Sequence, residues 1–234
     1  MKSELKAFSI PLKMYDEKTI REVLIYKRKI GTTKTVIYYI INSNTRFQVN
    51  LQQWFKDNLE LPEDLKQKVE YIKNIKSNTD KIREIHNFVR KNLIYYSDKV
   101  IWNADEYWAT IQETWTVRWN PVLKQYGRFA DCENFAMIQY AIGVYVGVPE
   151  YLMEIVAGWV VDSYGKQVGH CYLLVRSEED GLEYIMDGTY YPTMAHSMKH
   201  PYVTLKEYYY ADKEWFRFNH LGSYKLYINK PKIG

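Results

Sequence analysis

Cysteine is scarce in this sequence: of 234 residues, only Cys132 and Cys171 are cysteines. Two cysteines cannot build the several bridges that hold small secreted scaffolds together, and they are too few for a zinc cluster made of thiolates. Two cysteines still allow one structural disulfide. The scarcity therefore excludes a disulfide framework and directs attention to the chemistry of each thiol.

Long apolar runs are also missing. The amino-terminal segment MKSELKAFSIPLKMYDEKT mixes charged residues with short apolar stretches, so it lacks the continuous apolar segment of a secretory signal. No run of about 18 apolar residues, the length that a membrane-spanning helix needs, occurs elsewhere in the chain. We therefore expect a soluble cytoplasmic protein with no membrane partner.

The chain carries no strong charge of either sign. Lysine and arginine number 32 against 28 aspartate and glutamate, and this net charge of +4 permits an acidic partner without requiring one. Aromatic residues are abundant, with 23 Tyr and 7 Trp, but basic residues do not interleave with them as in nucleic-acid-binding modules. We expect these rings to pack in the core and on the surface, and we expect no nucleic-acid partner.

The amino-terminal part contains two β-rich runs, 21–29 and 34–42, which flank the turn-like segment IGTT. They predict an antiparallel hairpin, although the first run also fits a helix. Helical periodicity follows over residues 51–93, and the run Ser77, Asn78, Thr79 and Asp80 offers an N-cap for its second helix. We place a boundary at this signal.

The predicted division has two parts. Residues 1–76 form an amino-terminal hairpin with a helical extension, and residues 77–234 form the main domain. Within the main domain, residues 94–130 are aromatic and irregular, and they lead directly to Cys132. Long ordered connections of this kind are often functional.

The centre of the main domain alternates between helical and extended patterns. Residues 132–146, CENFAMIQYAIGVYV, predict a buried helix that stops at Gly147 and Pro149. Three β-like runs follow, over 151–162, 169–178 and 182–189. The sequence thus predicts an α+β fold class in which a helix packs on an antiparallel meander.

Three residues in this region have the chemistry of a thiol nucleophile and its helpers. Cys132 opens the predicted helix, where free backbone N–H groups and the helix dipole favour a thiolate and lower the pKa of the thiol. His170 lies near the start of the second strand run and Asp187 near the end of the third, and 187 − 170 = 17 fits two antiparallel strands. Such a hairpin brings imidazole and carboxylate side by side, as a base and its orienting group require.

Each of these residues also has a simpler interpretation. A single cysteine in an apolar helix is usually a small core residue, and a lone histidine before a strand is usually a structural group. The joint placement of Cys132, His170 and Asp187 at a helix start and two strand ends favours catalysis. Cys171 adjoins His170 on a strand, so its side chain points to the opposite face and is expected to be buried packing.

The order of these segments resembles the transglutaminase-like superfamily. That family has a G-D-C-E-D-like box, a G-H-A-like strand start and a D-G/P-T-like strand end, and this chain has DCENFAMIQYAIGVYV, GHCYLLV and LEYIMDGTYYP in that order. The resemblance extends upstream to IREIHNFVRKNLIYYSD and DEYWATIQETW, which are similar to phage-encoded members, and covers about residues 78–192. The departures are Ala130 for Gly, Asn134 for Asp and Cys171 for Ala.

The resemblance implies a papain-like catalytic core with an amino-terminal β-element, in which Cys132, His170 and Asp187 form a Cys-His-Asp triad. By analogy with papain-like enzymes, Gln125 is a candidate oxyanion donor beside the N–H of Cys132.

The carboxylates beside the nucleophile have two interpretations. In the bacterial transglutaminase-like cysteine proteinases the acidic pair at the positions of Asp131 and Glu133 is associated with calcium, and carboxylate oxygens suit this hard cation. Alternatively, Asp131 caps the helix and Glu133 complements its positive end, which needs no metal.

The predicted function is hydrolysis of peptide or amide bonds through a thioester on Cys132, with a protein or peptide substrate and no required cofactor. The same triad serves a protein-glutamine transglutaminase or a deamidase, although the DCE box is closer to proteinase members than to animal cross-linking enzymes. A different class is a retired enzyme that serves as a binding or virion-assembly module, because folds are reused without their activity. The similarity to phage-encoded members adds a virus particle to the expected locations.

Overall fold

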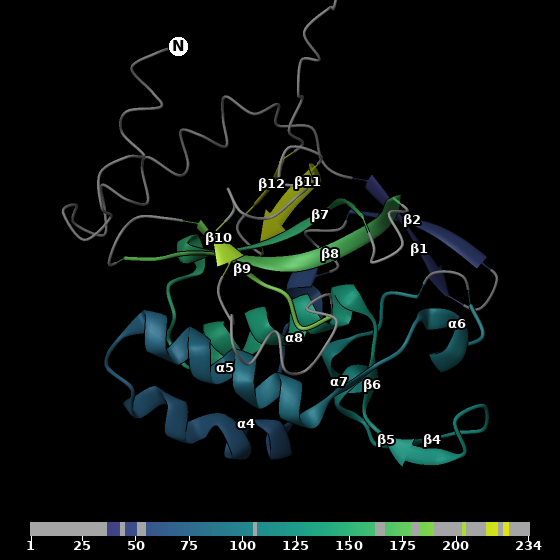
Figure 1. Ribbon diagram of the computed structural model, residues 1–234, viewed down its shortest axis with the longest axis horizontal. Helices are drawn as coiled ribbons and strands as arrows, with labels where there is room; N and C mark the ends of the chain where they lie inside the picture. Colours follow the sequence, from purple (N-terminus) through teal and green to yellow (C-terminus); the bar gives the residue numbers. More distant parts are fainter. Residues whose placement is uncertain are drawn as a thin grey trace, which may run out of the picture.

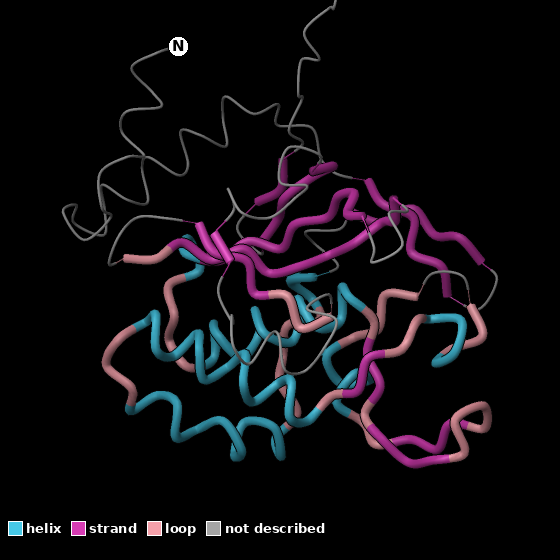
Figure 2. Tube along the Cα trace, viewed as in Figure 1, coloured by secondary structure: helices cyan, strands magenta, loops and turns pink. Residues whose placement is uncertain are grey.

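The computed structural model describes residues 37–42, 45–50, 55–104, 107–161, 167–178, 183–189, 203–204, 214–219 and 222–224. An antiparallel sheet forms one layer of the protein and helices form the other (Figure 1). Figure 2 shows the helices gathered on one face of this sheet and a small hairpin at the edge of the helical layer. The protein therefore has the predicted α+β class, with a helix packed on an antiparallel sheet.

The main sheet has the strand order β10-β9-β8-β7-β11-β12, and every neighbouring pair is antiparallel. Its strands are β7 (Met153–Val161), β8 (Gln167–Arg176), β9 (Glu183–Met186), β10 (Val203–Thr204), β11 (Glu214–Asn219) and β12 (Gly222–Tyr224). The strands β7, β8 and β9 correspond to the three predicted runs and confirm the predicted meander.

The helical layer contains one long helix beside the sheet and a second long helix outside it. Its elements are α4 (Glu63–Val69), the 3₁₀ helix η2 (Glu70–Asn74), α5 (Asn78–Asn92), α6 (Asp98–Ile101), α7 (Ile111–Trp115), α8 (Cys132–Tyr145) and the 3₁₀ helix η3 (Glu150–Leu152). The N-cap predicted for α5 is present, because the Ser77 side chain accepts a hydrogen bond from the backbone N–H of Asp80 at 3.2 Å.

Helix α8 is the centre of the core. It begins at Cys132 and ends at Tyr145, close to the predicted helix over 132–146, and its residues 133–143 are all buried. The sheet covers one side of α8 and α5 covers another (Figure 1). Gly147 stops the helix with a φ of 82°, a left-handed conformation that glycine adopts without strain.

The two faces of the sheet belong to different apolar clusters. On β8, Cys171, Leu173 and Val175 join the main core with α8, whereas Tyr172 and Leu174 belong to a second cluster. Successive side chains of a strand point to opposite faces, so this division follows directly from the alternation along β8. The expected role of Cys171 as buried packing is confirmed.

The connection between α5 and α8 is more regular than the sequence suggested. It contains α6, α7, a parallel pair of β3 (Ile94–Tyr95) and β6 (Phe129–Ala130), and a hairpin of β4 (Arg118–Asn120) and β5 (Gln125–Gly127). These elements have two to five residues each, which is too short for periodicity to reveal. Along the chain, β5 and β6 lead directly to Cys132 at the start of α8.

The amino-terminal region contains the antiparallel pair β1 (Ile37–Asn42) and β2 (Thr45–Asn50). β1 lies within the predicted run over 34–42, whereas the run over 21–29 lies outside the described residues. In the described part of the chain, no helix is both long enough and apolar enough to cross a membrane. Residues of α4 and η2, including Leu65, Val69 and Ile72, join the same core as α8.

Candidate active site

The first turn of α8 is held by the side chain of Asp131. One carboxylate oxygen of Asp131 accepts a hydrogen bond from the backbone N–H of Cys132 at 2.6 Å, and the other accepts from the N–H of Asp98 at 3.0 Å. The Asp131 side chain also accepts from the backbone N–H of Asn134, and in return the side-chain oxygen of Asn134 accepts from the N–H of Asp131 at 3.3 Å. This reciprocal arrangement is a capping box, so Asn134 serves the cap in place of an acidic residue.

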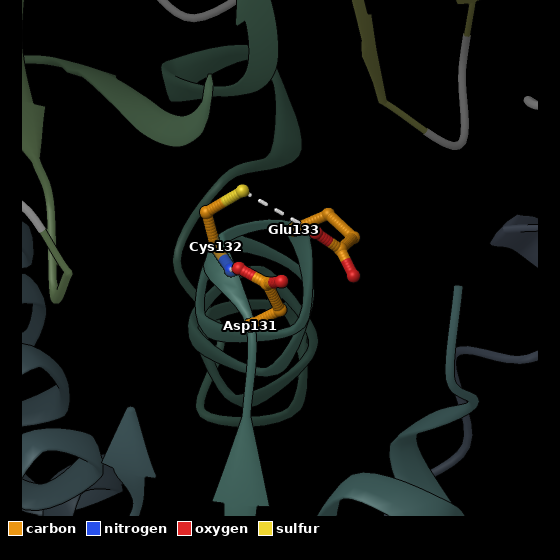
Figure 3. Close-up of side chains that lie close together, drawn as sticks. All are labelled: Asp131, Cys132 and Glu133. Carbon is orange, nitrogen blue, oxygen red and sulfur yellow. Dashed lines mark hydrogen bonds between the residues drawn. The ribbon is translucent and has the colours of Figure 1, made fainter. Parts of the chain in front are cut away.

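At the start of the helix the Cys132 sulfur points toward Glu133, whereas the Asp131 carboxylate lies beside the Cys132 backbone nitrogen (Figure 3). The sulfur donates a hydrogen bond to a carboxylate oxygen of Glu133 at 3.3 Å, and Glu133 is buried. Burial first, and then the charges of Glu133 and Asp131, raise the pKa of the Cys132 thiol well above its ordinary value. A backbone hydrogen bond from Cys171 acts in the opposite direction. The lowered thiol pKa that the helix start predicts is therefore not what this environment produces.

A buried histidine and aspartate meet at the other half of the site. His170 on β8 and Asp187, directly after β9, approach to 2.6 Å between Nε2 and Oδ2, and both side chains are buried. The backbone N–H of Thr189 donates to the second oxygen of Asp187 at 2.8 Å. Such short contacts involving a carboxylate are among the stronger hydrogen bonds in proteins. The predicted side-by-side placement of His170 and Asp187 is confirmed by this geometry.

The structure brings the predicted residues together in two groups. His170 is bonded to Asp187, while the Cys132 thiol interacts with Glu133 and with Cys171, the residue that follows His170. The Cys132 thiol therefore lies near the backbone of Cys171, the residue that follows His170 on β8. The direct pairing of nucleophile and base stays a prediction.

Behind Asp187 lies a polar arrangement that the sequence did not reveal. The amide nitrogen of Gln139 on α8 donates to the backbone oxygens of Phe135 at 3.0 Å and Met186 at 3.4 Å. Its oxygen is therefore left to face His86 Nδ1 on α5, 2.9 Å away. An amide oxygen can only accept, so His86 carries its proton on Nδ1. Gln139 thus links α5 and α8 to the end of β9, next to Asp187.

Burial lowers the pKa values of two side chains of α5, His86 and Arg90, and the charge of Asp187 raises both. Burial lowers the pKa of His86 to about 4, and the hydrogen bond to Gln139 opposes this shift. Burial also lowers the pKa of Arg90, one helical turn further on, whereas the negative charge of Asp187 raises it. His86 is consequently neutral near pH 7, and Arg90 supplies a positive charge on the Asp187 side of α5.

Asp131, Cys132 and Glu133 form a cluster of candidate metal ligands whose atoms all lie within 4.8 Å of one another. Carboxylate oxygens fit a hard cation such as Ca²⁺, which takes six to eight oxygen ligands. The Asp131 oxygens already accept hydrogen bonds from the backbone N–H groups of Cys132, Asp98 and Asn134 and from the Tyr95 hydroxyl, so a cation would replace some of these donors. The donor set suits Ca²⁺ by its chemistry, and the hydrogen bonds of Asp131 fit the capping interpretation.

Gln125 lies apart from the thiol in the hydrogen-bond network. It is exposed on β5, where it pairs with Asn120 of β4. No hydrogen bond among the described residues joins it to Cys132. Its role as an oxyanion donor stays a prediction.

No family model matches the chain, and no curated protein matches it either. Among solved structures, the chain is similar to Legionella pneumophila LapG with a TM-score of 0.47 and 16% identity, over 80% of this chain and 90% of that chain. It is similar to the EGTA-treated form with a TM-score of 0.45 and 17% identity, over 81% and 88% of the two chains. The calcium-bound form has a TM-score of 0.42 and 16% identity, over 88% and 87%.

The turn that holds Asp187 depends on a close approach by Gly188. A Cβ atom at Gly188 would overlap the ring of Phe135, which is buried on α8. We expect Gly188→Ala to destabilise the protein by about 1–3 kcal/mol, because the new Cβ overlaps a rigid, buried aromatic ring that must shift to admit it. Urea unfolding measures the difference. Gly143→Ala is the control, since its Cβ meets the flexible end of Met153 and alanine favours a helix; equal costs for both variants would contradict the proposed overlap.

The buried His86 gives folding stability a defined pH dependence. Its pKa is about 4 in the folded protein against an ordinary value of 6.5, which we take for the unfolded chain, so the unfolded chain binds more protons between these values. Stability therefore falls as the pH drops through 6.5 towards 4, by roughly 2 kcal/mol between pH 7 and pH 5. Urea titrations of the native protein and of His86→Gln, which cannot titrate, should differ by this amount. Parallel pH profiles for the two proteins would rule out this contribution.

Proposed function

We propose that the chain is a cysteine-dependent amide hydrolase of the transglutaminase-like kind, with a peptide or protein substrate. Cys132 is the nucleophile, His170 the general base and Asp187 the group that orients the imidazole. The observation that carries the proposal is the buried 2.6 Å contact of His170 with Asp187, on a strand whose next residue, Cys171, interacts with the Cys132 thiol. The order of the three sequence boxes adds support.

The proposed reaction proceeds by acyl transfer through the thiol. The proton of Cys132 passes to Nδ1 of His170, because Nε2 faces Asp187, and the sulfur attacks the carbonyl carbon of the substrate. The tetrahedral oxyanion needs N–H donors, for which the candidates are the Gln125 side chain and the N–H of Cys132, which would have to leave Asp131 to donate to the oxyanion. When the C–N bond breaks, His170 returns its proton to the departing amine. Water then hydrolyses the thioester and restores the thiol.

Asp187 keeps the imidazole in the orientation that this reaction needs. Its second oxygen is held by the N–H of Thr189, so the carboxylate is fixed on both sides. An aspartate in this role stabilises the imidazolium that forms during the reaction without taking the proton itself. The same residues catalyse deamidation or transamidation if an amide side chain is the substrate or an amine replaces water.

A second candidate function is a catalytically retired binding or assembly module. One observation favours it: the Cys132 thiol is hydrogen-bonded to Glu133, and its pKa is raised by burial and by the charges of Glu133 and Asp131. A thiol in this state is a poor nucleophile. The two candidates differ in whether the chain forms a covalent intermediate on Cys132.

A peptide-library experiment read by mass spectrometry distinguishes these functions. We expect the native protein to yield cleavage, deamidation or cross-linked products, and Cys132→Ala to lose about a thousandfold or more of this activity. Asp187→Asn should lose about a hundredfold or more, because the imidazole loses its orienting carboxylate. Cys171→Ala is the matched control, since it replaces a buried thiol that the reaction does not use. Equal product from native protein and Cys132→Ala would refute the nucleophile, and absence of both product and covalent labelling by cysteine-protease probes would favour the retired module.

We further propose that Asp131 and Glu133 bind Ca²⁺, which would supply positive charge beside the thiol. Isothermal titration should show binding at micromolar to millimolar Ca²⁺, the range of carboxylate sites, and Glu133→Gln should abolish it. Glu63→Gln is the control, because Glu63 is an exposed carboxylate on α4. Absence of heat and of thermal stabilisation at millimolar Ca²⁺ would leave the capping role as the sole interpretation of the pair.

A further inference from the structure

The β4–β5 hairpin presents two unlike faces. On its inner face Asn120 is buried and donates a hydrogen bond to the backbone oxygen of Val100 in α6 at 2.8 Å. On the opposite face Trp119 and Tyr126 are cross-strand partners with ring centroids 5.1 Å apart, and they are 49% and 72% exposed. An aromatic pair of this size is usually buried or held against another molecule.

Exposed apolar side chains are concentrated around this hairpin. Four of the seven large apolar side chains that are exposed in the described part of the chain lie within residues 117–126, and we refer to them as the hairpin surface: Val117, Trp119, Val122 and Tyr126. Two more, Ile94 and Tyr95, lie on β3, and the Tyr95 hydroxyl is hydrogen-bonded to Asp131. The seventh, Tyr71, lies on η2 and donates a hydrogen bond to Glu84. Such clustering is typical of an interaction site, whereas scattered single residues are not.

The hairpin is anchored to the body of the protein from behind. The guanidinium of Arg118 lies 4.0 Å from the ring centre of Trp102 and donates to the backbone oxygen of Glu113. Arg128 stacks on the ring of Trp115 and donates to its backbone oxygen at 2.7 Å. These contacts hold the hairpin, which projects from the edge of the helical layer (Figure 2), in one position. The Trp119 and Tyr126 rings are therefore preorganised for binding.

The charge of residues 114–130 indicates which kind of partner would bind the hairpin surface. Residues 114–130 contain no acidic residue, whereas Asp131 and Glu133 follow immediately. Lys124 is the exposed cation at the turn of the hairpin, and Arg118 and Arg128, which stack behind the hairpin, add positive charge at longer range. A bound chain with acidic residues over the hairpin is therefore attracted there and repelled by the acidic pair beside the thiol. The complementary partner carries acidic and apolar side chains on one part of its chain.

The hairpin surface lies on the stretch of chain that leads into the candidate active site. Tyr126 precedes Cys132 by 132 − 126 = 6 residues, and six extended residues span at most about 20 Å. Tyr95 pairs with Ala130 across the β3–β6 ladder, one residue before the cap of α8. An extended peptide of about six residues thus suffices to connect the hairpin surface with the thiol.

We propose that the hairpin surface binds an extended, acidic polypeptide segment whose aromatic or aliphatic side chains pack on Trp119 and Tyr126. This assignment names the class of substrate and rests on the proposed function for the claim that the bond attacked by Cys132 lies next to the bound segment. The binding itself needs no catalysis. It can therefore be measured on a protein without the nucleophile.

The test uses Cys132→Ala protein and two sets of fluorescent dodecapeptides, one combining Glu with Leu and Phe and the other combining Lys with the same apolar residues. Fluorescence polarisation should show binding of the acidic set alone. Adding Trp119→Ala and Tyr126→Ala together should weaken it by roughly tenfold or more, because exposed aromatic anchors dominate such interfaces. Lys124→Glu should weaken it in low salt and have less effect in high salt. Tyr71→Ala is the matched control, since it removes an exposed ring outside the hairpin surface.

The outcomes separate the inference from the proposed function. Equal binding of both peptide sets, or equal loss in the Tyr71→Ala control, would overturn the inference. So would a dimer in sedimentation velocity that the double variant abolishes without any peptide binding, because the occupant would then be a second copy of the chain. Binding of acidic peptides that the native protein never processes would support the hairpin surface and refute the hydrolase.

Discussion

The burial of α8 along residues 133–143 is the constraint on which the rest of this structure depends. A helix that is covered on all sides must satisfy each polar group that it carries into the core, and α8 carries Asn134 and Gln139. Asn134 closes the cap with Asp131, and Gln139 connects α5 to the end of β9. The packing of one helix therefore fixes the position of Cys132 at its start and of the strand end that carries Asp187.

The same burial creates an electrostatic conflict at Cys132. The helix start supplies N–H groups that favour an anion, but the adjacent carboxylates and the loss of solvent disfavour a thiolate. A functional nucleophile in this place needs a neighbouring positive charge when it reacts. An imidazolium on His170 or a cation held by Asp131 and Glu133 would supply it, and the retired-enzyme interpretation requires neither.

The sequence predicted those parts that depend on local pattern. The limits of α8, the cap at Ser77, the β7–β9 meander and the contact of His170 with Asp187 all followed from periodicity, capping residues and a spacing of 17 residues. It did not predict the link between His86 and Gln139, because these residues are 53 positions apart and each looks like an ordinary helical residue. The short strands of the β4–β5 hairpin were also missed, since three residues carry no usable alternation.

The central claim is that Cys132 attacks a carbonyl with His170 as its base. A crystal structure of the native protein with a peptide aldehyde tests it most directly, because the adduct reproduces the tetrahedral intermediate. The account predicts a bond from Cys132 Sγ to the aldehyde carbon and a hydrogen bond from His170 Nδ1 to the adduct, with the His170–Asp187 contact retained. An adduct on Cys171, or one on Cys132 with the imidazole of His170 out of reach, would contradict it.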